Sequence, residues 1–506
     1  MRKFWRIGLV LLIGLSACGD KKAEQAKALQ QEIQDLLARN GGSDKTLTYG
    51  DVTVTPDGDA FAVTIDKVVV APPEIAPIAL GKIGFRLTPD GDDIRKFSDV
   101  SLPPSVTVKD TDGKEVKIGM ALDHASGSWS KKMQQLLSTD LLLKSIEASK
   151  PSDSSKAEAS DVYYQLQTTD NGQGVYDQST AGGIKLFTFA DKDGQIALAD
   201  LKFVSNLGGA KLAELLALRA ASQKAAESSK PDQMLPLVAK IFQLFKTVKS
   251  TVSIGQVTVA AGGTTIFSLG GLNADFGIED TDQPKVNVSS SLSYTALSIP
   301  QMKDLVGGMG AEILPTDLGL SLKVNDLPMA VILDNWSKTL PDTKMSDENA
   351  MMGTGLIAAG GAIQAIQQGA VKMTIGDGKL KAPGLTGSFA AEVNNDAKAP
   401  MGFTGTATVE LSDLDVLIAK SQQYADEPTT AEIVGVLRMM RALSDHGTDA
   451  AGKPVDRFKI TIDDKGNTLV NGKAPMPPAA PAEPPSNGSG TTGTGSGSGS
   501  GSGTGQ

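Results

Sequence analysis

From Lys45 onward, apolar and polar residues alternate along much of the chain. The first clear case surrounds a turn at Asp57-Gly58, and its apolar positions are Val52, Val54, Phe61, Val63 and Ile65. Alternation with a period of two is typical of a half-buried antiparallel hairpin. Glycine suits the turn, because it adopts positive φ without a steric clash.

The same style of turn recurs along the sequence. The five residues "TPDGD" at the first turn occur again at Thr88–Asp92, with apolar positions on both sides. Similar turns are predicted at Asp112-Gly113, Asp193-Gly194 and Lys465-Gly466. The pattern predicts a chain built by the successive addition of hairpins.

Helical patterns interrupt these strands. They are predicted over Ser130–Ala148, Lys211–Glu227, Met234–Val248, Pro300–Gly307, Leu411–Tyr424 and Thr430–Ser444. Met351–Ala370 is rich in glycine and alanine, and we interpret it as a helix buried against a sheet. Grouped strands with helical insertions, without strict β-α alternation, predict an α+β fold. We expect long twisted antiparallel β-sheets built from repeated hairpins, with a disordered C-terminal tail.

Residues 23–39 have a helix-forming composition and carry an apolar stripe. The stripe consists of Leu29, Ile33, Leu36 and Leu37. Such a helix acts either as a spacer that holds the folded body away from a membrane, or as the first helix of that body. The sequence leaves both interpretations open.

Composition divides the chain into six segments. They are a lipoprotein signal peptide (1–17), a lipidated tether and helix (18–44), a β-hairpin domain with a C-terminal helix (45–150), a central antiparallel β domain with a helix pair (160–345), a C-terminal α+β region (346–475) and a tail (476–506). The polar stretches Lys150–Ser160 and Pro341–Asn349 are the predicted joints. The tail is rich first in Pro and Ala and then in Gly, Ser and Thr, so it cannot bury apolar surface and is predicted to be disordered.

The start of the chain carries a targeting pattern. Basic residues precede the apolar run Ile7–Leu15, whose length fits the ~7–15 residues of a signal-peptide core and falls short of the ~20 that cross a bilayer. Leu15-Ser16-Ala17-Cys18 follows and resembles the lipobox of bacterial lipoproteins. The resemblance implies cleavage between Ala17 and Cys18, a diacylglyceryl group on the Cys18 sulfur and an acylated new amino terminus.

Cys18 is the single cysteine in 506 residues, so internal disulfides are excluded and a packed core must hold the fold. Two or more acyl chains anchor a protein stably to a membrane. We therefore expect a lipid-anchored protein at the periplasmic face of the inner or outer membrane of a Gram-negative bacterium. The residues after Cys18 do not decide between the two membranes.

The charge balance narrows the expected partners. A net charge of −10 and a pI near 5.0 argue against nucleic acid, whose phosphates need a basic surface. They also argue against electrostatic attachment to anionic lipids. The expected partners are the membrane, through the lipid anchor, and a lipid ligand or other envelope proteins.

Few residues in the sequence suggest catalytic chemistry. The chain has two histidines, and we interpret His124 as a strand-end or loop residue and His446 as a cap near a helix C-terminus. The acidic turns "DTDGKE" and "DKDGQ" lack the full ligand set of a calcium loop, and Glu279, Asp280 and Asp282 are assigned to a solvated loop. The sequence also lacks the GxSxG, P-loop and dinucleotide motifs. We therefore predict no catalytic residue, no metal ligand and no cofactor.

Two stretches near the C-terminus carry a family resemblance. They are "FTGTATVELSDLDVLIAKSQQ" and "RFKITIDDKGNTLVNGKAPMP". The second resembles the "DxxG…VNG" terminal hairpin of Gram-negative envelope proteins of the YdgA and AsmA-like kind, at Asp464, Gly466, Val470, Asn471 and Gly472. The spacing departs by one, since a single residue separates Asp464 from Gly466, whereas two residues separate Asp463 from Gly466. A lipobox also stands where that family has a transmembrane helix.

The resemblance implies a role in the cell envelope that involves lipid. Our first hypothesis is a non-catalytic, membrane-anchored periplasmic lipoprotein whose curved sheet binds lipid or another envelope component through an apolar face. The alternatives are an envelope hydrolase that uses scattered carboxylates, and a structural or assembly factor of the envelope. The lining of the sheet's inner surface distinguishes these hypotheses.

Overall fold

The structure is a computed structural model. It describes residues 21–38, 47–71, 77–109, 113–133, 135–150, 155–215, 217–218, 240–241, 243–339, 366, 370–427, 430–449 and 452–474. Cys18, Ala17 and the tail over 476–506 lie outside the described residues.

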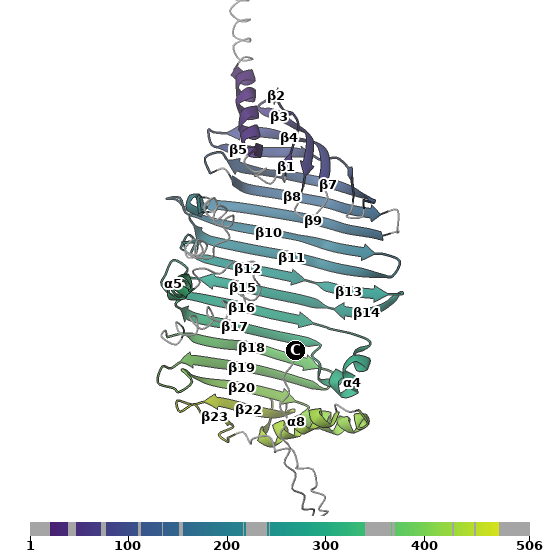
Figure 1. The fold of residues 1–506 in the computed structure, drawn as a ribbon, viewed down its shortest axis with the longest axis vertical. Helices are drawn as coiled ribbons and strands as arrows, with labels where there is room; N and C mark the ends of the chain where they lie inside the picture. The colour runs from purple at the N-terminus through teal and green to yellow at the C-terminus, as the bar shows by residue number, and fades with distance from the viewer. Residues whose placement is uncertain are drawn as a thin grey trace, which may run out of the picture.

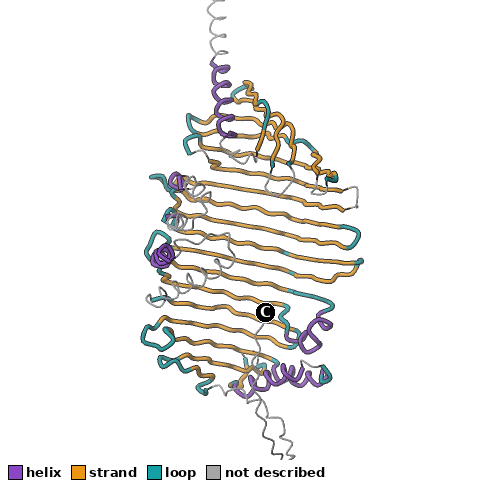
Figure 2. The backbone as a smooth tube through the Cα atoms, in the orientation of Figure 1, coloured by secondary structure: helices purple, strands orange, loops and turns teal. Residues whose placement is uncertain are grey.

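In the described part of the chain, all 23 strands belong to one antiparallel sheet. Most strands pair with the strands before and after them in sequence, so the chain meanders from one end of a long sheet to the other (Figure 1). The helices lie at the two ends and along the edges of the sheet, as Figure 2 shows. This arrangement confirms the predicted α+β class and the predicted antiparallel sheet of repeated hairpins.

The first strands are β1 (Leu47–Thr48), β2 (Val52–Asp57), β3 (Ala60–Val70), β4 (Ile78–Asp90), β5 (Ile94–Ser101), β6 (Ser105–Lys109), β7 (Glu115–Ser130) and β8 (Gln135–Lys150). The middle strands are β9 (Ser155–Asp170), β10 (Tyr176–Ala190), β11 (Gly194–Ala210), β12 (Thr247–Ile254), β13 (Gln256–Ala261), β14 (Thr264–Leu269), β15 (Gly271–Glu279) and β16 (Val286–Thr295). The last strands are β17 (Asp317–Leu327), β18 (Lys372–Ala382), β19 (Leu385–Asn395), β20 (Phe403–Ser412), β21 (Asp445–Thr448), β22 (Pro454–Ile462) and β23 (Thr468–Val470). The helices in the described residues include an N-terminal helix over 21–38, α4 (Met302–Ile313), α5 (Met329–Thr339), α7 (Leu414–Lys420) with the 3-10 turn η1 (Ser421–Tyr424), and α8 (Thr430–Leu443); residues 212–215 and 217–218 are helical as well.

The predicted turns join paired strands. Gly58, Gly91 and Gly466 adopt positive φ between β2 and β3, β4 and β5, and β22 and β23. The carboxylate of Asp191 accepts the backbone N–H groups of Asp193 and Gly194, each at 2.9 Å, and so fixes the turn between β10 and β11. Aspartate in this turn therefore serves the local backbone, as the sequence predicted.

One helix prediction is wrong. Ser130–Ala148 was expected to be helical, but Ser130 ends β7, and Gln135–Lys150 forms β8. Strand β8 pairs with β7 on one side and with β9 on the other. The apolar residues of β8 have a helix-like spacing because the register of this strand with β7 shifts between Leu143 and Ser145.

The other helix predictions have mixed outcomes. Leu411–Tyr424 and Thr430–Ser444 correspond to α7 with η1 and to α8, and Pro300–Gly307 corresponds to a longer helix, α4, that breaks at Gly307. The end of the predicted helix Met234–Val248 is wrong, because Thr247 and Val248 begin β12. Most of the remaining residues of Lys211–Glu227 and Met234–Val248, and nearly all of Met351–Ala370, lie outside the described residues.

Hydrogen bonding of the sheet continues across both predicted joints. Lys150 at the end of β8 pairs with Ser155 at the start of β9, so the stretch Lys150–Ser160 contains two paired strand ends. β17 pairs with β18 on either side of the second joint. Pro341–Asn349 itself lies outside the described residues.

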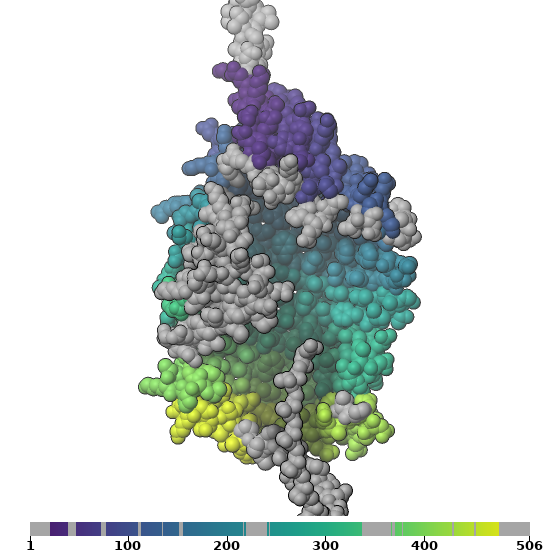
Figure 3. All heavy atoms as spheres, in the orientation of Figure 1, coloured from purple at the N-terminus to yellow at the C-terminus, as the bar shows by residue number. Residues whose placement is uncertain are grey.

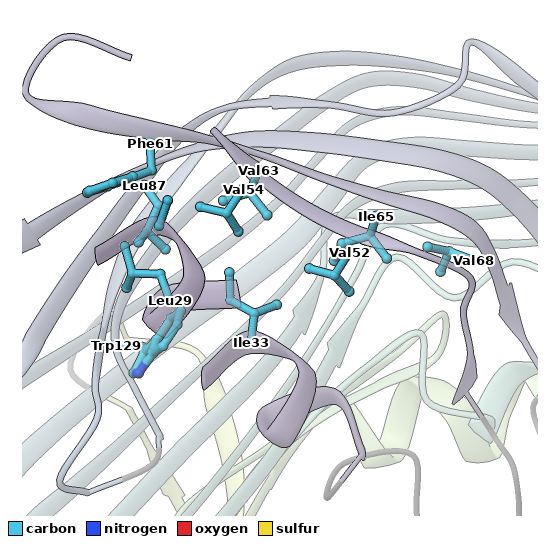
Figure 4. Close-up of a cluster of buried hydrophobic side chains, with 11 residues drawn as sticks. Leu29, Ile33, Val52, Val54, Phe61, Val63, Ile65, Val68, Leu87 and Trp129 are labelled. Atoms are coloured by element: carbon cyan, nitrogen blue, oxygen red, sulfur yellow. The ribbon is translucent and has the colours of Figure 1, made fainter. Parts of the chain in front are cut away.

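The helix over 21–38 belongs to the folded body. Its residues Ala26, Leu29 and Ile33 are buried against strands β2, β3 and β4, and Trp129 of β7 closes the cluster. Figure 4 shows Leu29 and Ile33 among the apolar side chains of these strands. The structure thus decides between the two interpretations that the sequence left open.

An ion pair also ties this helix to the sheet. Glu32 lies 3.5 Å from the buried guanidinium of Arg95 on β5, and Lys131 lies 3.2 Å from the same carboxylate. Because Arg95 is buried, removal of Glu32 would leave an unpaired charge away from water. The contact fixes the position of the helix at the N-terminal end of the sheet.

Candidate functional site: an apolar sheet face

Side chains that lie directly opposite one another form an apolar row across the middle of the sheet. This central row runs over β8, β9, β10, β11, β12, β15, β16 and β17, and consists of Leu141, Tyr164, Gly182, Phe203, Val252, Ala274, Leu292 and Leu320. We call the side of the sheet that carries this row the apolar face. Opposite residues on paired strands share a face, so the row is a continuous strip of apolar side chains.

The central row has apolar neighbours on the same face. A second row lies two residues further along each strand. Its members on β12 to β20 are Ile254, Leu272, Tyr294, Leu318, Leu380, Gly387 and Leu411. From β8 to β20 the sheet takes ten steps between strands, which at ~4.8 Å each span roughly 48 Å. The apolar face is therefore much longer than one side chain cluster.

Large side chains in the central row are open to solvent. Phe203 is 38% exposed, Val252 43%, Leu292 46% and Leu320 38%. Phe276 on β15, in an adjacent row, is 45% exposed. Single exposed apolar residues are ordinary, but a contiguous strip of them marks a surface that binds something.

Aromatic rings lie flat across glycines on this face. A β-carbon at Gly182 would collide with the ring of Phe203, and one at Gly378 would collide with the ring of Phe389. Each ring thus covers the bare backbone of the neighbouring strand. This packing keeps the floor of the apolar face low and continuous.

The opposite side of the same strands is polar. Asp275 on β15 accepts hydrogen bonds from Thr251 on β12 and Ser291 on β16, each at 2.7 Å. The hydrogen bonds from Ser291 and then Thr251 hold the pKa of the Asp275 carboxyl below its ordinary value. We call this side the outer face, and its hydroxyl and carboxylate groups contrast with the uncharged central row.

A crease crosses the strands β8, β9, β10 and β11. Asp161 and Asp200 adopt positive φ in the middle of β9 and β11, and Lys185 of β10 and Gly255, which follows β12, lie beside them. At this line the spacing of apolar residues changes from two to three, as from Leu143 to Ile146, from Val162 to Ala159, from Ile184 to Phe187 and from Leu201 to Leu198. A bulge-like residue breaks the alternation of a strand, so the step of three keeps apolar side chains on one side.

Both ends of the apolar face are closed by helices. At the N-terminal end, a row of directly opposite residues crosses β4, β5, β7 and β8 and consists of Leu87, Phe97, Gly127 and Thr139. Thr139 is two residues from Leu141, so this row lies on the apolar face. The helix over 21–38 packs against Leu87 and therefore lies on this same face. Figure 3, drawn from the side on which that helix lies, shows the middle of the molecule hollowed between its edges.

At the C-terminal end, the face meets a cluster of charged groups beneath α8. Leu411 of β20 lies opposite Asp456 of β22, and the buried carboxylate of Asp456 accepts hydrogen bonds from Arg441 and Ser444, each at 2.7 Å. Arg441 also holds Asp415 of α7 through two hydrogen bonds, which lower the pKa of the Asp415 carboxyl. These contacts fix the end of α8 over the last strands.

A second buried carboxylate anchors the helices to each other. Glu312 of α4 binds Lys420 of α7 at 2.7 Å and Tyr424 of η1 at 3.0 Å. Burial acts to raise the pKa of Glu312, but the hydrogen bonds from Lys420 and Tyr424 outweigh burial, and the pKa is lowered. Met309, Leu414, Leu417 and Leu437 form the apolar core around this pair.

The two histidines lie in different places. His124 lies on the outer face, and His446 lies beside Asp456 at the C-terminal end of the sheet. His124 was expected at a strand end or in a loop, and this is wrong, because it lies inside β7. It sits on the outer face between Asp123 at 2.9 Å and Asp140 at 3.4 Å, and the hydrogen bond to Asp123 raises its pKa.

His446 is a strand residue of β21 and not a cap on the preceding helix, which ends at Leu443. Its Nδ1 faces Asp456 at 2.7 Å and Ser444 at 3.1 Å, while its Nε2 faces Arg441. A catalytic triad places the serine and the carboxylate on different ring nitrogens. Here both lie at Nδ1, so this group holds strands and helix together without the order that activates a nucleophile.

The assignment of Glu279 to a loop is wrong, because Glu279 is the last residue of β15, and the acidic residues near this strand end do not converge. Glu279 pairs with Lys249 at 2.6 Å, Asp280 accepts a hydrogen bond from Asn287 at 2.6 Å, and Asp282 lies 3.9 Å from Lys246. Among the described residues, no group of three His, Cys, Asp or Glu side chains is placed to hold a metal ion. The described helices also include none that is long and apolar enough to cross a membrane.

The closing motif "VNG" has a structural role. Asn471 adopts positive φ, and its side chain donates to the carbonyl oxygens of Leu443 at the end of α8 and Arg457 of β22. Asp463, rather than Asp464, binds the turn, because it accepts the backbone N–H groups of Lys465 and Asn467. The motif joins the last hairpin to α8.

Comparisons with family models, with curated proteins and with solved structures found no match to this chain. The apolar face was expected from the sequence only in general terms. The sequence analysis did not identify its individual residues. One signal was present, because apolar and polar residues alternate in one predicted strand after another.

Proposed function

We propose that this protein is a non-catalytic lipoprotein of the bacterial envelope that binds the acyl chains of a lipid along its apolar face. The observation that carries the proposal is the central row, with Phe203, Val252, Leu292 and Leu320 each more than a third exposed. Acyl chains gain ~0.8 kcal/mol for each methylene that they bury, and the row offers a long apolar strip for them.

The length and shape of the face support a chain-like ligand. The span of roughly 48 Å exceeds the ~30 Å hydrocarbon core of a bilayer. A compact ligand would be held by an enclosed pocket, whereas a strip of apolar side chains between two closed ends suits an extended one. Its polar group would remain at an edge, because the central row carries no charge.

The test uses the chain from residue 19 onward, purified without a lipid anchor. Organic extraction followed by mass spectrometry should recover bound acyl lipid. A fluorescent fatty-acyl probe should bind, and Leu292→Asp should weaken its binding by at least about tenfold, because a carboxylate would then face the hydrocarbon.

Ser293→Asp is the matched control, since Ser293 is the next residue of β16 and lies on the outer face. We expect this variant to bind the probe like the unaltered protein. Absence of extracted lipid together with equal probe binding by the two aspartate variants would refute the proposal.

We also propose that Cys18 carries the lipid anchor and that Ala17-Cys18 is the cleavage site. The support is the lipobox pattern Leu15-Ser16-Ala17-Cys18 after a short apolar run. Cells given labelled palmitate should label the unaltered protein and fail to label Cys18→Ser. Equal processing and equal detergent partition of the two forms would contradict this anchor.

A further inference from the structure

A pair of hydroxyl groups lies within the apolar face. Ser205 of β11 is directly opposite Ser250 of β12, and their Oγ atoms are 3.0 Å apart. Ser205 is two residues from Phe203, and Ser250 is two residues from Val252, so both serines point to the same side as the central row. Both are half-buried.

Along β11 and β12, apolar side chains flank this pair on the same face. Phe203 and Val252 flank it on one side, and Leu207 and Val248, which are also opposite each other, flank it on the other. Phe276 lies directly opposite Ser250 on the next strand and is largely open. Thr180 of β10 lies directly opposite Ser205, so the serines belong to a short polar row that apolar side chains flank on this face.

The pair has a spare donor. Each serine has one hydroxyl hydrogen, and a single hydrogen bond between two hydroxyls uses only one of the two. Among the described residues, the structure gives these hydroxyls no hydrogen bond other than the one they share. The second hydrogen is available to an acceptor that lies on the apolar face.

From this geometry we infer that Ser205 and Ser250 bind the ester carbonyl of an acyl lipid, and so select an ester-linked lipid over a plain hydrocarbon or ether chain. The inference rests on the proposed function and names the substrate class of the same face. A neutral carbonyl fits the spot better than a free fatty acid, because the nearest described residues on this face of β10, β11, β12 and β15 include no cation; they are Gln178, Thr180, Phe203, Leu207, Val248, Val252 and Phe276. A carboxylate placed there would lose its hydration without a counter-charge.

The experiment compares two lipids that differ only in the carbonyl. Dioleoylglycerol and its dioleyl ether analogue compete with the fluorescent acyl probe for the chain from residue 19 onward. We expect the ester to bind roughly threefold to tenfold more tightly, which is the range for one additional hydrogen bond.

The double variant Ser205→Ala/Ser250→Ala should lose this preference and keep its affinity for the ether. Removing both partners of a hydrogen bond is nearly neutral for folding, so the variant should unfold at the same temperature as the unaltered protein. Ser253→Ala is the matched control, because Ser253 lies on β12 and on the outer face, and it should keep the ester preference.

The outcomes separate the two proposals. Equal binding of ester and ether by the unaltered protein, or an ester preference that survives the double variant, would overturn the serine site while the lipid-binding function stands. Failure of both lipids to displace the probe, or of the probe to bind at all, would overturn the function and the serine site with it.

Discussion

The carboxylate of Asp161 on β9 lies 3.5 Å from the ammonium group of Lys185 on β10, at the line where both strands change their apolar spacing from two residues to three. Asp161 holds φ at 46° inside a strand, where most residues are extended. Asp200 does the same on β11 at 51°. Aspartate tolerates this conformation better than bulky residues do, so the crease is encoded by particular side chains.

We predict that the backbone, and not the ion pair, makes Asp161 important. Asp161→Val should destabilise the protein by ~1–2 kcal/mol, because a β-branched residue is strained at positive φ. Asp161→Gly and Asp161→Asn should change the stability by less than ~0.5 kcal/mol, since the ion pair is exposed and contributes little. Thermal unfolding of the three variants checks this. A loss with Asp161→Asn as large as that with Asp161→Val would show that the charge matters more.

The helix over 21–38 should contribute strongly to stability. Ile33→Ala removes buried methyl groups and should lower the free energy of unfolding by ~2–5 kcal/mol. Lys27→Ala, on the exposed side of the same helix, should change it by no more than ~0.5 kcal/mol. Denaturant unfolding measures both variants. Equal stability of the two variants would show that the helix acts as a spacer and does not stabilise the folded body.

The outer face should give the protein a measurable dependence of stability on pH. The folded-state pKa of Asp275 is lowered by Ser291 and Thr251, so its ionised form adds stability above the ordinary aspartate pKa of ~3.9. This contribution should be lost as the pH falls from about 5 through the lowered folded-state pKa. Asp275→Asn should therefore flatten the fall in melting temperature over that window.

Ser291→Ala should flatten the same fall in part, because it removes the first of the two hydrogen bonds from hydroxyl groups. Ser293 lies on the same strand, and among the described residues the hydrogen bonds to the Asp275 carboxylate come from Thr251, Asn273 and Ser291. Ser293→Ala should therefore leave the fall unchanged. An unaltered slope in Asp275→Asn would exclude this carboxylate as its source.

Gly182 and Phe203 should be coupled. Gly182→Ala places a β-carbon against the Phe203 ring, and we expect a loss of ~1–3 kcal/mol in stability from the crowding. Phe203→Leu in the same chain should recover part of that loss, since the smaller side chain leaves room. A double-mutant cycle by thermal unfolding measures the coupling. Strictly additive losses would show that the ring does not rest on this glycine.

The wrong helix prediction over Ser130–Ala148 has a physical reason. In β8 the step from Leu143 to Ile146 follows Leu141 and Leu142, and this combination imitates the three- and four-residue spacing of a helix. The spacing of three comes from the crease, which forms only when neighbouring strands bend together. A pattern read along one segment cannot show that its neighbours bend at the same place.

The local chemistry of this chain determined its hairpins, its turns and its class. Alternating apolar residues and turn glycines act over a few residues, so Gly58, Gly91 and Gly466 could be placed from the sequence alone. The tertiary structure decided which residues share a face. Phe203, Val252 and Leu292 are far apart in sequence and became one row only through the register of the strands. Register depends on pairing between distant segments, and for that reason the apolar face, its serine pair and the crease were visible only in the folded sheet.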